Sequence, residues 1–400
     1  MNKPKIRFKG FEGEWKKVKI GDVAPLTGGF AFQSGQFKTS GVPIIRISNI
    51  LSSGIVGGDF VYYNEFKGDS EFRLYKGDVV IAMSGATTGK VATFEANDFG
   101  YQNQRVGKFS RTNLVNYELL SKLVSAPNFQ KKIISKLTSS AQPNASSKDI
   151  DSIDLVVPEE TEEQRALASY FTSLDAQIAA STSRLSSLKQ IKAASLLNMF
   201  PQKGETVPRV RFKGFQGEWV RQRLGDISAS FSGGTPAVSV SDYYGGNIPF
   251  IRSGEIHEDR TQLYITQAGL NNSSAKIVEK GTILYALYGA TSGDVGISKL
   301  RGAINQAILA IEPTKDIDNF FLAGFLQSYK NRIINEFLQG GQGNLSGSLV
   351  KKILLAIPSL PEQRAIASYF TALDAQITLH RERLEKLKQI KAACLEKMFA

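Results

Sequence analysis

Two nearly identical stretches decide the fold of this chain: EQRALASYFTSLDAQI at Glu163–Ile178 and EQRAIASYFTALDAQI at Glu362–Ile377. Fourteen of their sixteen positions are identical, and both stretches run on into KQIKAA. Apolar residues recur at steps of 3 and 4, the spacing of one helix face. They are Leu174, Ile178, Leu185, Leu188 and Ile191 in the first copy and Leu373, Ile377, Leu384, Leu387 and Ile390 in the second. Each copy predicts an amphipathic helix of roughly 38 residues, ~57 Å long, with a coiled-coil seam.

The rest of the chain repeats in the same way. RFKGFEGEW at Arg7–Trp15 returns as RFKGFQGEW at Arg211–Trp219, and GDVVIAMSGATTG at Gly77–Gly89 is echoed by GTILYALYGATSG at Gly281–Gly293. A single duplication explains this pattern, whereas a solenoid would repeat many times at a short period. The chain is therefore two copies of one module.

Each module predicts an α+β domain followed by a long helix. The expected boundaries are a first domain at 1–157, a long helix at 158–200, a linker at 201–209, a second domain at 210–357 and a second long helix at 358–400. Duplicated modules tend to pack about a pseudo-twofold axis. We therefore expect the two helices to pair as an antiparallel coiled coil.

Local patterns predict the elements of the first domain. Strands are expected at Val42–Ile50, Val79–Ser84, Arg105–Ser110 and Ile150–Val157, with helical pattern over Asn116–Leu137 broken near Pro127 and a polar loop at Ser139–Lys148. Thr161 is the expected N-cap of the first long helix, with Gln164 as its capping-box partner.

Composition restricts the function classes. The single cysteine, Cys394, excludes an intrachain disulfide. With only His257 and His380 beside it, no structural zinc site is expected. No apolar run has the length of a membrane span or a signal core, so we expect a cytoplasmic protein. The formal net charge of +12 and the pI near 9.5 favour a polyanionic partner, nucleic acid before a membrane surface.

The two domains share framework segments and differ in their loops. Ala31–Gly41 bears no resemblance to Pro236–Gly246, and Leu51–Lys76 none to His257–Lys280. One scaffold thus carries two different reading surfaces. If both faced one duplex about the pseudo-twofold axis, they would engage two different half-sites separated by unread base pairs. We expect a bipartite and asymmetric target.

Each copy has a variable domain, an N-x-S loop, a strand ending in Pro, an E-Q-R motif and a long helix. The motifs are Asn144–Ser146, Pro158 and Glu163–Arg165, then Asn344–Ser346, Pro358 and Glu362–Arg364. This order resembles the specificity subunit of type I restriction-modification systems over essentially the whole chain. The first copy reads PEETEEQ where that family usually has a Pro-rich turn before the Glu, and the second, PSLPEQ, fits the family better.

This resemblance implies a subunit without catalysis or cofactor of its own. Two target recognition domains read the two halves of a bipartite DNA target. The paired helices act as a ruler and dock two methyltransferase subunits, which use S-adenosylmethionine to methylate an adenine in each half-site. A restriction subunit that translocates DNA with ATP and Mg²⁺ joins when unmethylated DNA is cut.

Candidate DNA-contacting residues lie in polar or Gly-rich loops. In the first domain they are Arg46, Ser84, Thr87, Thr88, Lys90, Gln102, Asn103, Gln104, Arg105, Asn144, Ser146 and Lys148; in the second they are Arg252, Tyr288, Thr291, Ser292, Asn305, Gln306, Asn344 and Ser346. Gln and Asn can bond adenine and Arg can bond guanine. We assign base reading to Gln102 and Arg105, because Asn103-Gln104 recurs in a domain expected to read other bases.

Several of these assignments have alternatives. Gly85–Lys90 is not a P-loop, because only three residues separate its glycines and Val91 follows the Lys; it is a phosphate-facing turn or an ordinary Gly-rich hairpin turn. Arg46 and Arg252 are phosphate ligands or buried ion-pair partners. The N-x-S loops contact the DNA backbone or are solvated connections.

Other functions explain the sequence less well. A self-sufficient methyltransferase would carry an Asn/Asp-Pro-Pro-aromatic motif, which is absent, and a nuclease would need clustered carboxylates. A coiled-coil scaffold without a nucleic-acid role leaves the charge and the divergent loops unexplained. Tyr170-Phe171 and Tyr369-Phe370 are expected to pack in the core, as is His380, which occupies the seam position of Ser181.

Overall fold

The structure is a computed structural model, and it describes residues 3–138, 145–338 and 345–399. The chain divides into two compact units. The first comprises Met1–Thr182 with Glu382–Ala400, and the second comprises Ser183–Arg381. Each unit therefore contains one α+β domain and parts of both long helices. The two units are described separately below.

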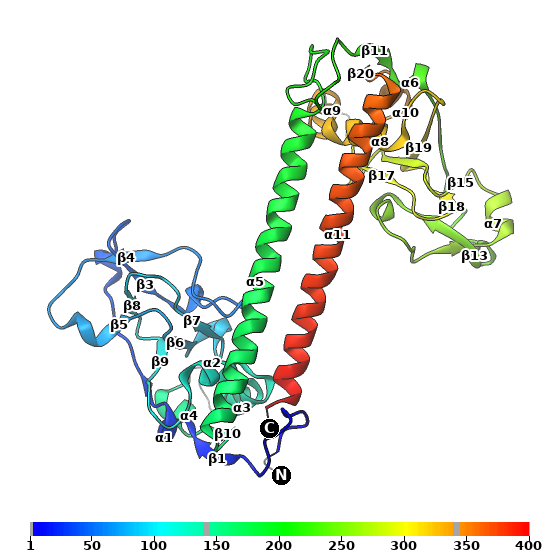
Figure 1. The fold of residues 1–400 in the computed structure, drawn as a ribbon. Helices are drawn as coiled ribbons and strands as arrows, with labels where there is room; N and C mark the ends of the chain where they lie inside the picture. The colour runs from blue at the N-terminus through cyan, green and yellow to red at the C-terminus, as the bar shows by residue number, and fades with distance from the viewer. Residues whose placement is uncertain (1–2, 139–144, 339–344, 400) are drawn as a thin grey trace. The chain divides into compact units, whose positions relative to one another are not determined.

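The two long helices form as predicted. Helix α5 spans Thr161–Asn198 and helix α11 spans Leu360–Lys397, each with 38 residues. In the first unit the beginning of α5 lies beside the end of α11, and in the second unit the end of α5 lies beside the beginning of α11 (Figure 1). Antiparallel pairing is thus seen within each unit.

The helix seam follows strict steps of 4 and 3. Ser181, Leu185, Leu188, Lys192 and Ser195 continue it in α5. Buried seam positions include Leu174, Leu185, Leu188, Leu373, Ile377 and Leu384, while Ile178 and Leu387 are half-buried. The prediction was wrong for Ile191 and Ile390, which are 44% and 37% exposed. In both helices the seam steps alternate between 4 and 3, and the step that ends at Leu188 or Leu387 is one of 3. The next inward position is therefore four residues further on, at Lys192 and Lys391.

The first unit contains three small sheets. One has the order β2 (Leu26–Thr27), β9 (Val106–Phe109), β6 (Val79–Ala82), β7 (Val91–Thr93); another has β4 (Val61–Tyr63), β3 (Val42–Ile45), β8 (Gly100–Gln102), β5 (Arg73–Leu74); and β1 (Lys16–Lys19) pairs with β10 (Asp154–Val157). The pairings are antiparallel except that between β3 and β8.

Short helices complete this unit. They are α1 (Ile20–Val23), α2 (Tyr117–Ser125), α3 (Pro127–Thr138) and α4 (Ser147–Asp151), with 3-10 turns η1 (Ser34–Gln36), η2 (Ile47–Asn49), η3 (Asp69–Phe72) and η4 (Gly85–Thr87). The break at Pro127 is confirmed. The polar loop ends earlier than expected, because Ser146 caps α4 by accepting a hydrogen bond from Asp149 N at 3.2 Å.

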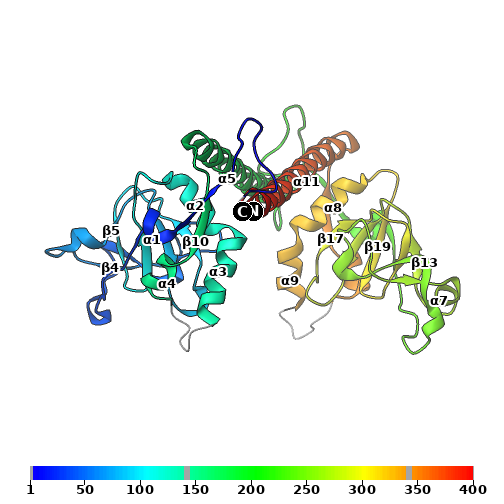
Figure 2. The same ribbon diagram turned by 90° about the horizontal axis from the view of Figure 1, so that it is seen from below.

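The second unit repeats this plan. Its sheets are β12 (Ser228–Ser232), β19 (Ile308–Pro313), β16 (Ile283–Ala286), β17 (Val295–Ile297); β14 (Tyr264–Ile265), β13 (Tyr244–Ile251), β18 (Gly302–Ile304), β15 (Lys276–Val278); and β11 (Val220–Arg223) with β20 (Leu354–Ile357). Its shorter helices are α6 (Leu224–Ile227), α7 (Gln267–Asn271), α8 (Asn319–Ser328), α9 (Lys330–Leu338) and α10 (Gly347–Lys351), with 3-10 turns η5 (Ser241–Tyr243) and η6 (Ser253–Glu255). Helix α8 lies between α11 and the sheet that contains β17 and β19 (Figure 2).

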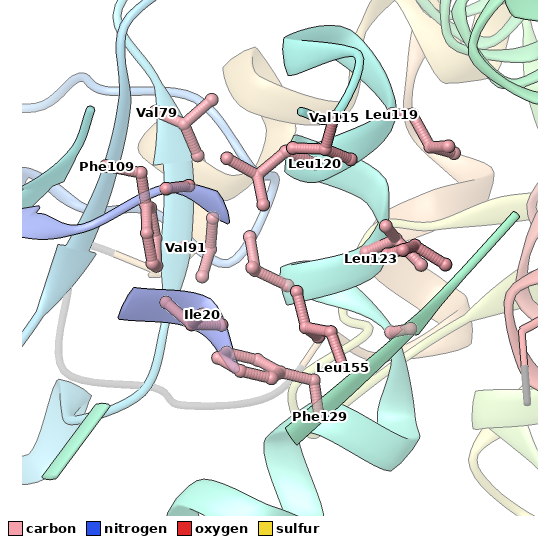
Figure 3. Packing of buried hydrophobic residues seen from close by; sticks show 14 of the residues in the cluster. Ile20, Val79, Val91, Phe109, Val115, Leu119, Leu120, Leu123, Phe129 and Leu155 are labelled. Atoms are coloured by element: carbon pink, nitrogen blue, oxygen red, sulfur yellow. The ribbon is translucent and has the colours of Figure 1, made fainter. Parts of the chain in front are cut away.

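The core of the first unit lies between its sheet and its helices. Side chains from β6, β7 and β9 meet those of α2 and α3 (Figure 3); among them are Val79, Val91, Phe109, Leu119, Leu120, Leu123 and Phe129. All are at most 8% exposed. The same packing recurs in the second unit around Phe321 and Phe325 of α8.

Each core is completed by the Met-Phe pair that follows a long helix. Phe399, after α11, stacks on Phe171 of α5 at 5.2 Å in the first unit. Phe200, after α5, stacks on Phe370 of α11 at 5.7 Å in the second. Both Phe side chains are at most 4% exposed. The end of each helix is therefore held in the core of the domain that precedes the other helix.

Within the described residues, no helix has both the length and the apolar character that a membrane crossing requires.

Candidate nucleic-acid interface

In the first domain the candidate loops converge at one edge of the sheets. Strands β3 and β8 run parallel with Ile45 opposite Gln102, so Arg46 and Asn103 leave the sheet side by side. Asn103 N donates a hydrogen bond to Ile45 O at 3.2 Å. Parallel strands bring their carboxyl ends to the same edge, where α/β proteins commonly place ligand-binding loops.

Two further segments reach this edge through backbone hydrogen bonds. Met83 N, at the end of β6, donates to Arg105 O at 3.0 Å, and Ala145 N donates to Met83 O at 2.8 Å. Thr87 Oγ1 donates to Ile47 O at 3.3 Å, which places turn η4 against η2. We call Arg46, Ser84–Lys90, Asn103–Arg105 and Ala145–Lys148 the first edge.

The second domain builds the same edge with the same bonds. Asn305 N donates to Ile251 O at 3.3 Å, next to Arg252. Leu287 N donates to Ala307 O at 2.8 Å, and Leu345 N donates to Leu287 O at 2.9 Å. We call Arg252, Tyr288–Asp294, Asn305–Ala307 and Leu345–Ser348 the second edge.

A glycine pair packs beneath each edge. A Cβ on Gly29 would lie 2.3 Å from Gln102 O, and one on Gly233 would lie 1.9 Å from Ile304 O. Only glycine permits this approach of two backbones. The sequence analysis missed these residues, although the repeated Gly-Gly at 28–29 and 233–234 was a visible signal.

Several predicted residues of the first edge are accessible. Gln104, Arg105, Ser146 and Lys148 are exposed, and Arg46, Thr87, Thr88, Lys90 and Asn103 are half-buried. The Thr88 hydroxyl donates to Gly85 O at 2.6 Å and keeps its acceptor capacity. The tight turn expected at 85–89 is present, with φ of +73° at Gly85 and +85° at Gly89. Asn144 and Asn344 lie outside the described residues.

Three predicted contacts are contradicted by burial. Gln102 is 0% exposed, and its Nε2 donates to Thr27 O at 2.8 Å and to Val106 O at 2.7 Å. Ser84 and Ser292 are 4% and 9% exposed, and the Ser292 hydroxyl donates to Leu287 O at 3.1 Å. Gln102 belongs to a strand, whose side chains alternate between faces, and it points inward. Gln102 and Ser292 hold the edge together through these bonds, and all three side chains are too buried to reach a ligand.

The second edge presents neutral polar groups. Gln306 and Ser346 are exposed, while Tyr288, Thr291 and Asn305 are half-buried. Partial burial raises the pKa of Tyr288 and keeps its hydroxyl protonated. Ser346 also accepts a hydrogen bond from Leu349 N at 3.3 Å and so caps α10.

The paired arginines differ between the domains. Arg252 forms an ion pair with Glu255 at 3.0 Å, and the Glu255 hydrogen bond raises the pKa of Arg252. Asn49 stands beside Arg46 in the place that Glu255 has beside Arg252, and Arg46 Nη2 donates to Asp59 O at 3.4 Å. Arg252 is therefore an ion-pair partner, whereas Arg46 has no acidic partner among the described residues and stays a predicted phosphate ligand.

The two repeated motifs contact each other in both units. Arg7 of RFKGF donates from Nε and Nη2 to both carboxylate oxygens of Glu163, each at 2.7 Å. Arg211 and Glu362 form the same pair at 2.6 and 2.7 Å. Glu163 and Glu362 are each 1% exposed. We call this pair the Arg–Glu latch; sequence reasoning missed it, although both motifs recur with opposite charges.

The E-Q-R glutamine joins each long helix to its domain. Gln164 Oε1 accepts from Asn116 N at 2.7 Å, at the start of α2, and its Nε2 donates to Pro158 O at 2.8 Å. Gln363 makes the matching bonds to Asp318 N and Pro358 O at 2.8 and 3.0 Å. The motif therefore fixes the helix to the recognition domain.

Ion pairs mark the helix pairing in each unit. In the first, Asp175 of α5 contacts Lys391 of α11 at 2.5 Å and Lys122 of α2 at 2.6 Å. Burial by itself raises the pKa of Asp175, but its hydrogen bonds with the two lysines outweigh burial and lower it. In the second unit Lys192 of α5 contacts Asp374 of α11 at 2.6 Å.

The tyrosines of the repeated stretch also lie between the helices. The Tyr170 hydroxyl lies 3.4 Å from Cys394 Sγ, and the Tyr369 hydroxyl lies 2.8 Å from Ser195 Oγ. Phe171 and Phe370 are buried, as predicted. His380 is half-buried, which agrees with packing. Across 3–138, 145–338 and 345–399 there is no group of His, Cys, Asp and Glu suited to hold a metal ion.

Comparison with known proteins points to one family. The model described as "Type I restriction modification DNA specificity domain" matches twice, at residues 12–190 and 216–389. The putative type I restriction enzyme MjaX specificity subunit of Methanocaldococcus jannaschii is 24% identical over 396 residues, covering 94% of this chain and 91% of its own. The MjaIX specificity subunit of the same organism is 28% identical over 184 residues, covering 43% of this chain and 42% of its own.

Solved structures show the same fold. The S subunit of a type I restriction-modification system from M. genitalium superposes with a TM-score of 0.68 at 16% identity, covering 100% of this chain and 99% of that one. A chain from a study of complex assembly in the type I R-M system gives a TM-score of 0.55 at 18% identity, covering 95% and 96%. With two specificity domains, each built around the same loop-bearing edge, this chain belongs to the family of type I restriction-modification DNA specificity subunits.

Proposed function

We propose that this chain reads an asymmetric, bipartite DNA sequence, with the domain at 1–157 on one half-site and the domain at 210–357 on the other. The observation that carries the proposal is the edge itself, which is built twice with the same backbone bonds but carries different side chains. A shared scaffold with different exposed groups supports two readers of two different sequences.

Base reading is assigned to the exposed long polar side chains of each edge. On the first edge these are Gln104 and Arg105, and on the second it is Gln306. Gln104 replaces Gln102 in this assignment because Gln102 is buried, whereas Gln104 and its counterpart Gln306 are exposed. Amide side chains suit adenine and guanidinium suits guanine, at ~1–3 kcal/mol of discrimination for a good bidentate pair. Half-buried Thr87, Thr88 and Asn103 suit the phosphate backbone, whose contacts set register.

The long helices at 158–200 and 358–400 are proposed to set the unread gap and to dock two methyltransferase subunits. Much of their outer surface is exposed, including Ile191 and Ile390. The chain itself supplies no catalysis; S-adenosylmethionine, and ATP with Mg²⁺, belong to the methyltransferase and restriction subunits. Membership of the specificity-subunit family supports this division.

Replacing the first recognition domain tests the proposal. Residues 1–157 are exchanged for the corresponding domain of another specificity subunit, and the DNA methylated by the assembled complex is compared. We expect one half of the target to change while the half read by 210–357 and the gap stay the same. A change in both halves together would contradict independent reading.

A further inference from the structure

We infer that the first edge grips DNA phosphates electrostatically, whereas the second edge reads its half-site through neutral hydrogen bonds. This inference rests on the proposed function and adds a division of labour between its two recognition domains. It predicts that the salt dependence of binding comes mainly from residues 1–157.

The residue after the Gly-rich turn has opposite charge in the two domains. Lys90 follows the first turn and, in the described part of the chain, its ammonium makes no hydrogen bond or ion pair. Asp294 follows the second turn, where it contacts His257 Nε2 at 2.9 Å and Lys330 Nζ at 3.3 Å. The counterpart of Lys330 beside the first turn is the neutral Gln130. The first turn therefore offers a free cation and the second does not.

The arginine that both domains share has an acidic partner in the second domain but not in the described part of the first. Arg252 is held by Glu255 at 3.0 and 3.2 Å and also donates to Gln262 Oε1 at 3.2 Å. Arg46 faces Asn49, whose amide bonds to Gly57 O and Asp59 O and carries no charge. Asp59 is exposed, and its carboxylate forms no ion pair within the described ranges. The guanidinium of Arg46 is available to a phosphate.

Two further cations occur on the first edge alone. Arg105 and Lys148 are exposed, and Ala307 and Ser348 stand at the matching positions of the second edge. Asp149 directly follows the first edge, and its carboxylate accepts hydrogen bonds from Ser146 N at 2.9 Å and Ser146 Oγ at 2.6 Å.

The imbalance extends to the whole domains. Residues 1–157 contain 21 Lys and Arg against 14 Asp and Glu, while residues 210–357 contain 15 against 12. The first domain therefore carries more net positive charge than the second, just as the first edge carries more than the second edge.

This asymmetry has a measurable consequence for binding. Each cation that neutralises a phosphate releases condensed counterions. The slope of log K against log salt is negative, and each such contact makes it steeper by about 0.9. Between about 50 and 200 mM salt, one such contact changes affinity by about 3- to 4-fold. Neutral contacts such as those of Gln306 add affinity without adding to the slope.

The test uses the chain assembled with its methyltransferase subunits. Binding to a fluorescent duplex that contains the target found by methylation mapping is measured by anisotropy across that salt range. Lys90→Gln and Lys148→Gln each remove one cation, so each is expected to make the negative slope shallower by about 0.9. The matched variant Gln306→Ala is expected to weaken binding at every salt concentration with an unchanged slope. Circular dichroism checks that each variant is folded.

A gain-of-charge variant makes the test independent of lost contacts. Glu255→Asn gives the second edge the residue that stands beside Arg46 and frees Arg252 from its ion pair. We expect a steeper slope, by up to about 0.9. Unchanged slopes in Lys90→Gln, Lys148→Gln and Glu255→Asn would overturn the inference.

The same data separate this inference from the proposed function. If the unaltered complex binds a duplex with both half-sites scrambled as tightly as its target, sequence reading itself fails and the inference falls with it. The other case is that the unaltered complex prefers its target but no substitution changes the salt slope. If neither the removal of carboxylates on the second edge (Asp294→Asn, Glu255→Asn) nor the removal of cations on the first edge changes that slope, only the division of labour is wrong.

Discussion

Arg7 joins the first recognition domain to its helix through one side chain. Its guanidinium bonds Glu163 twice and also donates to Gly13 O at 2.7 Å and Glu12 O at 2.9 Å. Glu163 is almost fully buried, so its charge depends on this partner. The Glu163 hydrogen bond raises the pKa of Arg7, so the guanidinium keeps its charge.

We predict that Arg7→Ala lowers the free energy of unfolding by about 3 kcal/mol, because a buried carboxylate is left without its counter-charge. Arg165→Ala is the control: Arg165 is 69% exposed and lies 3.9 Å from Glu162, a surface pair worth at most about 1 kcal/mol. Urea unfolding of both variants decides the matter. Equal effects would show that the Arg–Glu latch does not stabilise the fold.

Single residues are where sequence reasoning succeeded least. The loops that hold Arg105 and Gln306 were found, because polar residues after apolar strands point to an edge. The inward direction of Gln102, Ser84 and Ser292 depends on which face of a short strand packs on the core, and two or three residues carry too little alternation to show it. The Arg–Glu latch joins motifs 156 residues apart, a separation that no local pattern spans.

Among the elements, the Met-Phe pairs after the long helices complete the domain cores. Phe399 stacks on Phe171 and lies 6.5 Å from Trp15, while Asn128 Nδ2 donates to Phe399 O at 3.3 Å. Phe200 stacks on Phe325 at 4.9 Å in the second unit. Each pair connects the end of one helix to the opposite domain.

We expect Phe399→Ala to destabilise the first unit by about 3–5 kcal/mol, the range for truncating a buried Phe. Hydrogen exchange followed by mass spectrometry should show faster exchange in α2 and the beginning of α5. The matched variant Phe200→Ala should instead speed exchange in α8 and the beginning of α11. Identical exchange maps for the two variants would contradict the separate cores.

A pH effect is expected at the helix pairing of the first unit. Because Lys122 and Lys391 lower the pKa of Asp175 below its ordinary value of 3.8, its stabilisation is complete above about pH 4. It is lost as the pH falls through the folded-state pKa, since the unfolded chain takes up the proton first.

The urea midpoint should therefore be higher for the unaltered chain than for Asp175→Asn at pH 6, and the gap should close below about pH 4. Asp374→Asn serves as the matched control, because Asp374 is 52% exposed and is expected to change the midpoint less. A gap that stays constant down to pH 3 would show that this carboxylate contributes nothing through its charge.

Most elements could be predicted, because their signals are local. Heptad patterns without Gly predicted both long helices, and Pro127 predicted the break between α2 and α3. The seam error at Ile191 arose from following apolar residues; the helix geometry requires the next inward position at Lys192, whose charge is satisfied by Asp374. Helix α4 was missed because five residues are too few for a periodic signal.

At the scale of the whole molecule, the duplication predicted the order of domains and helices from the sequence alone. Which loops of a domain meet at one edge could not be predicted, since it depends on the parallel pairing of β3 with β8 and of β13 with β18, strands separated by long stretches of chain. The ion pairs within each unit further show that the two helices are matched to each other in register.

This register changes how the ruler role should be tested. Lengthening the stretch from Leu185 to Phe200 by whole helical turns should alter the unread gap and spare the half-sites, but an insertion in one helix alone also shifts Lys192 from Asp374. We predict that inserting seven residues after Leu185 and seven after Leu384 lengthens the gap by about three base pairs, from ~1.5 Å per residue against ~3.4 Å per base pair. An unchanged gap in a folded, active complex would remove the ruler role.

If this chain gives a methyltransferase complex its bipartite target, the positions of methylated adenines must depend on the chain. The chain is produced together with its cognate methyltransferase subunits, and methylated adenines are mapped across the host genome by single-molecule sequencing. We expect one asymmetric motif, with two different half-sites and a fixed gap, that disappears when this chain is left out. Methylation by an active, chain-bound complex without such a motif would contradict sequence reading and favour a scaffold role.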